Sequence, residues 1–116
     1  MTRRECYDRV RQTVRVGVDE DSMRLQLSEL EARLLAHGLG QGTPLLPFIP
    51  GEDDAPLSVG DAHAALYVYY LAARAYLAFG DTDRFESLYG LYLTAYDDYA
   101  AYRTRTCSTP TPTVYI

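Results

Sequence analysis

Apolar residues recur every three or four positions along much of the chain, the spacing that gathers side chains on one face of an α-helix. This pattern predicts four helices, at about residues 3–15, 20–37, 58–79 and 83–103. The third is apolar almost all round, which indicates a central helix that is contacted from several sides. The second has the clearest single face, formed by Met23, Leu27, Leu30 and Leu34. We therefore expect an all-α fold of four helices.

Capping residues mark the ends of these helices. Thr2 and Glu5 have the spacing of a capping box, in which each side chain accepts a hydrogen bond from a free backbone N–H. Residues 58–61 repeat that spacing with Asp in place of Glu, so the third helix is expected to begin there. Gly38 and Gly80 follow the second and third helices, where the left-handed conformation that ends a helix suits glycine.

The second helix has two further local features. Asp19 precedes it and is the expected N-cap. Glu29 and Arg33 are four positions apart on the polar side of the helix, so we expect an ion pair between them.

Two segments interrupt or follow the helical pattern. Glycine and proline punctuate residues 38–57, where they exclude a regular helix. We expect an ordered, extended arm here that packs on its own core or on a neighbour, because it contains Leu45, Leu46, Phe48 and Ile49. Residues 104–116 are predicted to form an extended C-terminal tail, so the helical domain spans residues 1–103. The tail either frays or docks as an added strand on a neighbour through its apolar ending, Val114, Tyr115 and Ile116.

Nine of the eleven tyrosines fall between Tyr67 and Tyr102. In the fourth predicted helix they form a stripe at spacings of three and four, made of Tyr89, Tyr92, Tyr96 and Tyr99. A second stripe beside it consists of Leu88, Leu91 and Ala95. One interpretation is that the leucine and alanine stripe faces the protein's own core while the tyrosine stripe meets another molecule. The alternative is that the tyrosines cap a small core and point their hydroxyls at water.

Composition and charge exclude several classes of function. The chain of 116 residues is 47% hydrophobic and 23% charged, which is typical of one globular domain. Its 16 acidic and 11 basic residues give a net charge of -5, which disfavours broad binding to a phosphate backbone. The longest apolar stretch, residues 62–79, contains His63 and Arg74, so it indicates a core helix rather than a membrane span.

No pattern of catalytic or metal-binding residues stands out. Cys6 and Cys107 do not have the spacing of a zinc site. We expect two free thiols in a reduced, intracellular protein, and a disulfide between them is the less favoured alternative. The glycines at positions 38, 40 and 42 lack the lysine of a phosphate loop. We predict no enzyme and no cofactor; a small enzyme that uses Cys6 or His63 is the least favoured alternative.

Part of the chain resembles a single tetratricopeptide hairpin. The resemblance lies in residues 75–81 (AYLAFGD), followed by Phe85, Leu88 and Tyr92. That family stacks several units of about 34 residues, whereas the unit occurs here once. The resemblance implies a cellular, cytoplasmic interaction module that binds a peptide.

A broader resemblance covers residues 18–105. The acidic, capped helix of residues 18–35 (VDEDSMRLQLSELEARLL) is followed by an irregular segment and an Ala- and Tyr-rich helix pair at residues 64–105. This order resembles the small helical head–tail connector (adaptor) proteins of tailed bacteriophages. The resemblance implies a structural protein of the virion neck that forms a ring of identical copies between portal and tail proteins and has no enzymatic activity. DNA would be at most a passing cargo, which the acidic balance suits.

Overall fold

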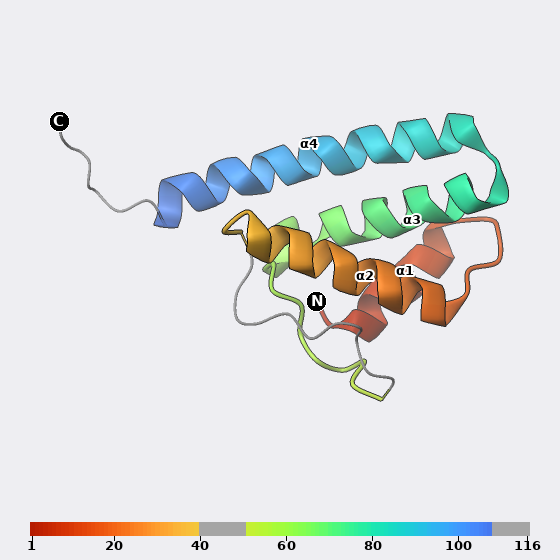
Figure 1. Ribbon diagram of the computed structural model, residues 1–116, viewed down its shortest axis with the longest axis horizontal. Helices are drawn as coiled ribbons and strands as arrows, with labels where there is room; N and C mark the ends of the chain where they lie inside the picture. Colours follow the sequence, from red (N-terminus) through yellow and green to blue (C-terminus); the bar gives the residue numbers. More distant parts are fainter. Residues whose placement is uncertain (40–50, 108–116) are drawn as a thin grey trace, which may run out of the picture.

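The computed structural model describes residues 1–39 and 51–107. These residues form four α-helices, one short 3-10 helix and no β-strand. Figure 1 shows how the α-helices are arranged. The helices are α1 (Arg3–Thr13), α2 (Glu20–Ala36), η1 (Asp61–His63), α3 (Ala65–Phe79) and α4 (Thr82–Cys107). The predicted all-α class is therefore confirmed for the described part of the chain.

Helix α3 lies at the centre, as its apolar surface predicts. It contacts α1, α2 and α4, and its most extensive contact is with α4, which runs back along it as a helical hairpin (Figure 1). Helix α1 lies on the side of α3 away from α4 in this view, while α2 lies across α3 and its C-terminal end reaches α4 through the contact of His37 with Tyr96. The four residues of the predicted face of α2, Met23, Leu27, Leu30 and Leu34, are fully buried, and so is Ser28 of the same helix.

The predicted caps largely form. The Thr2 hydroxyl accepts from the Glu5 amide at 3.2 Å, and the Glu5 carboxylate accepts from the Thr2 amide at 2.9 Å. The carboxylate of Asp19 accepts from the Ser22 amide at 3.0 Å. Gly80 ends α3 with a φ of 95°, in the left-handed region. Gly38, which follows α2, is also in the left-handed region, with a φ of 74°.

The predicted start of the third helix is wrong. Helix α3 begins at Ala65, and Asp61–His63 form only a 3-10 turn before it. The reason is a long-range contact: the hydroxyl and amide of Ser58 both donate to the Glu31 carboxylate, at 2.8 and 3.1 Å. Ser58 is thereby held against α2 and does not cap a helix of its own.

Two other boundaries move. Helix α1 ends at Thr13, because Val14 is extended with φ -93° and ψ 153°. Helix α4 continues to Cys107, four residues past the predicted end at 103. The helical domain therefore extends to residue 107, and residues 104–107 are helix rather than tail.

The described end of the predicted arm packs on the protein's own helices. Backbone hydrogen bonds join the amide of Arg4 to the Asp53 carbonyl at 2.8 Å and the amide of Leu57 to the Met1 carbonyl at 3.0 Å. Leu57 is buried in the core. The arm's other apolar residues, Leu45, Leu46, Phe48 and Ile49, lie outside the described residues, as do Val114, Tyr115 and Ile116 of the tail.

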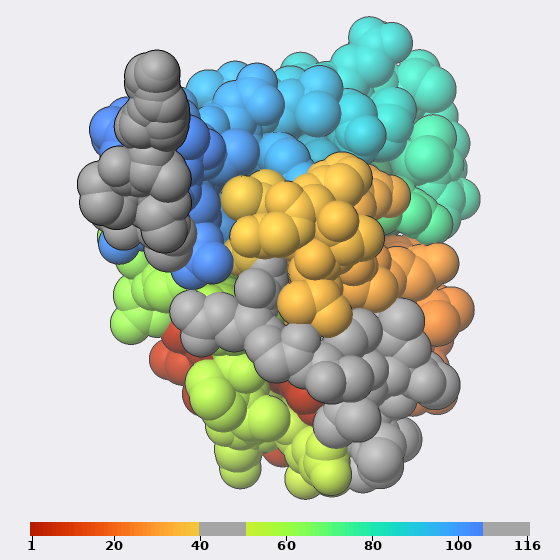
Figure 2. Space-filling view, turned by 60° about the vertical axis from the view of Figure 1, so that its left-hand side comes forward, coloured from red at the N-terminus to blue at the C-terminus, as the bar shows by residue number. Residues whose placement is uncertain are grey.

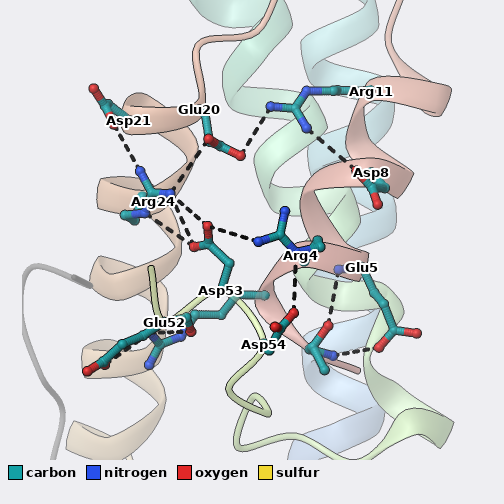
Figure 3. A network of polar contacts seen from close by, with 12 residues as sticks. Arg4, Glu5, Asp8, Arg11, Glu20, Asp21, Arg24, Glu52, Asp53 and Asp54 are labelled. Carbon is teal, nitrogen blue, oxygen red and sulfur yellow. Dashed lines mark hydrogen bonds and ion pairs between the residues drawn. The ribbon is translucent and has the colours of Figure 1, made fainter. Parts of the chain in front are cut away.

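A buried ion pair fixes residues 51–57 against α2 (Figure 3). Arg24 donates from Nη2 to both Asp53 carboxylate oxygens, at 3.2 and 2.9 Å, and both side chains are buried. Arg24 also pairs with Asp21 of its own helix at 2.9 Å. The hydrogen bond to Asp53 raises the pKa of Arg24. Two elements distant in sequence are thus joined by opposite charges shielded from water.

Candidate interaction surface

The tyrosine stripe of α4 faces the core of its own chain. Tyr92 and Tyr99 are only 2% and 3% exposed, and Tyr89 and Tyr96 are half-buried against the same core. Tyr92 and Tyr99 are therefore too buried in their own chain for the interpretation in which the stripe meets another molecule, which stays a prediction for Tyr89 and Tyr96. The alternative, that tyrosines cap the core, fits the stripe better, although their hydroxyls find protein partners.

Hydroxyl partners explain why tyrosine is tolerated in this core. The Tyr99 hydroxyl donates to the Leu39 carbonyl at 2.7 Å, and the Tyr96 hydroxyl lies 2.5 Å from Nδ1 of His37. Burial raises the pKa of Tyr92, and the charge of the nearby Arg33 guanidinium acts against that rise. A buried hydroxyl without a partner would be costly, so these contacts allow the stripe to turn inward. Figure 2 shows the end of α2 lying against α4, and His37, which follows α2, contacts Tyr96 of α4.

The leucine and alanine stripe lies on a flank of α4 that the described chain leaves partly open. Leu91 is 49% exposed and Tyr102 is 40% exposed, while Leu88 and Ala95 are half-buried beside them. Spacings of three, four and seven place all four on one side of the helix. We call this surface, consisting of Leu88, Leu91, Ala95 and Tyr102, the apolar flank.

A hollow of about 270 Å³ lies on the other side of α4, between α2, α3 and α4. It is lined by Arg33, Tyr70, Arg74, Leu77, Phe85 and Tyr89. The hollow thus combines two guanidinium groups with aromatic and aliphatic walls and has no acidic side chain in its lining.

Tyr70 organises the two arginines. The guanidinium carbons of Arg33 and Arg74 each lie 5.7 Å from the centroid of the Tyr70 ring, within cation–π range. Arg74 also donates to the Tyr70 hydroxyl at 2.9 Å. The predicted ion pair between Glu29 and Arg33 does not form, since Arg33 turns toward the Tyr70 ring and the Tyr92 hydroxyl instead.

Neither arginine has an acidic partner within residues 1–39 and 51–107: the ion pairs there involve other side chains. Sequence reasoning missed this pair because Arg33 and Arg74 are 41 positions apart and belong to no motif. Their helical registers alone do not reveal that the fold brings them to one ring.

The two candidate catalytic residues, Cys6 and His63, pack against other side chains of the fold. Cys6 is a free and fully buried thiol, and burial raises its pKa to about 12. A thiol in this environment stays protonated at neutral pH and is a poor nucleophile. The His63 ring lies tilted against the Tyr102 ring, with ring centroids 4.6 Å apart. Across the described residues, no three His, Cys, Asp or Glu side chains come together as a metal site.

None of the helices in the described ranges combines the length and the apolar character needed to cross a bilayer. The comparisons with known proteins add no identification: the chain matches no protein-family model, no curated protein and no solved structure. The connector and tetratricopeptide resemblances therefore stay predictions that rest on the sequence.

Proposed function

We propose that this protein is a structural, non-enzymatic subunit that assembles with copies of itself into a ring, in the manner of a head–tail connector between portal and tail proteins. The observation that carries the proposal is the apolar flank of α4. Its central residue, Leu91, is half exposed on a helix whose neighbouring tyrosine stripe already fills the core. A partner helix that covers this flank would remove apolar surface from water, at about 25 cal/mol per Å².

The position of the open surfaces supports a ring rather than a simple pair. The apolar flank and the arginine-lined hollow are different surfaces on two sides of α4. A contact between two different patches is heterologous, and repeated heterologous contacts close into rings when the rotation permits. The end of the α3–α4 hairpin adds further apolar surface, with Phe79 70% exposed and Leu77 at the edge of the hollow.

The net charge of -5 supports the connector form of this proposal. An acidic ring repels the phosphate backbone, so DNA is able to pass without adhering. Localisation in the virion neck and contacts with portal and tail proteins belong to the same proposal.

Native mass spectrometry and electron microscopy of the purified chain test it. The expected result is a closed particle with one copy number and a central opening. A purified chain that stays monomeric at tens of micromolar concentration would contradict the proposal. A monomer that instead binds short peptides in the hollow would favour the second candidate, a peptide-binding module, for which the hollow lined by arginine and aromatic side chains is the supporting observation.

A further inference from the structure

The hollow between α2, α3 and α4 has the chemistry of a carboxylate site. A guanidinium offers a planar fork of N–H donors that matches a carboxylate, and two such groups converge here on Tyr70. The lining supplies no acid, and no described carboxylate pairs with either group. Leu77 and Phe85 form an apolar border to the two charges.

A complementary carboxylate occurs on the apolar flank. Asp98 is exposed and makes no ion pair within the described residues. It follows Leu91 by seven positions and precedes Tyr102 by four, so all three lie on one side of α4. Between Leu91 and Tyr102 this side of α4 therefore presents one negative charge, opposite in sign to the two guanidinium groups of the hollow.

Helix geometry keeps this carboxylate away from the hollow of its own chain. Tyr89, which lines the hollow, and Asp98 are nine positions apart on α4. Nine residues at 3.6 per turn correspond to a rotation of about 180° around the axis. One copy cannot place its own Asp98 in its own hollow, so this contact requires a second copy.

We infer that Asp98 of one copy docks in the hollow of the next, between Arg33 and Arg74, while Leu91 of the first copy packs against the apolar border of the hollow. This inference deepens the proposed function and rests on it, because it names the surfaces through which the copies meet. Each copy offers both surfaces, so the contact repeats from head to tail around a ring.

Charge reversal in the full-length chain tests the contact by sedimentation velocity over a range of concentrations. Arg33→Glu and Asp98→Arg each place like charges opposite one another, so either variant alone should associate about tenfold more weakly or worse. A mixture of the two variants makes every contact complementary again when the copies alternate. The mixture should therefore assemble, with equal amounts of both chains in each particle, and a purely structural role of either residue would not produce this rescue.

Matched controls are Arg9→Glu on α1 and Asp97→Arg, one position from Asp98 on α4; both residues are exposed, and both variants should assemble as the wild type does. Circular dichroism confirms folding, and Arg74→Glu replaces Arg33→Glu if the latter unfolds. Assembly of the single variants at wild-type strength, or a mixture that stays dissociated, would overturn the inference and leave the proposed function standing. A wild type that remains monomeric would overturn both.

Discussion

Asp53 is the residue on which the position of the 51–57 segment depends most. Its carboxylate is buried and meets Arg24 from α2, while its backbone carbonyl accepts from the start of α1. A buried charge is tolerated only when a partner compensates for its lost hydration. One residue, through its carboxylate and its backbone carbonyl, thus links three parts of the chain.

Substitution of this residue tests that role. Asp53→Asn keeps the shape and removes the charge, leaving the Arg24 guanidinium buried without its main counter-charge, and should lower the free energy of unfolding by about 3 kcal/mol. Asp54→Asn is the control, because Asp54 is 89% exposed and its ion pair with Arg4 should contribute less than about 0.5 kcal/mol. Urea unfolding measures both variants, and equal effects would mean that the pair does not stabilise the fold.

Tyr67 shows at the same scale how hydrogen-bond partners accommodate a buried hydroxyl. Tyr67 is fully buried, and its hydroxyl donates to Glu31 at 2.5 Å while it accepts from the Val59 amide at 2.9 Å. Desolvation raises the pKa of Tyr67, so the phenol stays neutral. The identity of a tyrosine does not reveal such partners, which come from segments 8 and 36 positions away.

At the scale of elements, the ends of α3 and α4 are set by local chemistry. Gly80 joins them with a φ of 95°, whereas Gly90 lies inside α4 with open space where a Cβ would be. The two glycines therefore predict opposite effects of the same substitution.

Gly80→Ala should lower the free energy of unfolding by about 1 kcal/mol, because a Cβ disfavours the left-handed conformation. Gly90→Ala should raise it by about 0.5–1 kcal/mol, because alanine loses less backbone freedom in a helix. Thermal unfolding followed by circular dichroism should show Tm shifts of opposite sign. Shifts of the same sign would contradict the described backbone at one of the two positions.

The helices themselves were predictable from the sequence, because periodicity and capping are local. The face of α2 formed by Met23 and its apolar neighbours, the Thr2 capping box and the Gly80 stop all follow from residues within a few positions. The start of α3 did not follow, since Ser58 is engaged by Glu31 from another helix.

The orientation of α4 was the main failure of sequence reasoning. Two apolar stripes run side by side on this helix, and periodicity alone does not choose which one faces inward. The choice depends on what the rest of the chain presents to α4. The Tyr70 ring of α3 lies tilted against Tyr92, with ring centroids 5.0 Å apart, and the Leu39 carbonyl accepts a hydrogen bond from the Tyr99 hydroxyl. The arginine pair of the hollow was missed for the same reason, because only the packed helices bring it together.

At the scale of the whole molecule, two unlike surfaces remain open on either side of one long helix. One is apolar with a single carboxylate, and the other is a hollow with two guanidiniums that no described carboxylate meets. Their complementarity is the basis for regarding the chain as one unit of a larger assembly.

Substitution in the apolar flank tests this account most directly. Leu91→Asp places a charge where we expect a copy-to-copy contact, while Leu25→Asp does the same at a leucine of α2 that is equally open, at 52% exposure against 49%. We predict by native mass spectrometry that Leu25→Asp keeps the particle mass of the wild type and that Leu91→Asp yields monomers. Particles of unchanged mass from Leu91→Asp would contradict the claim that copies meet through α4.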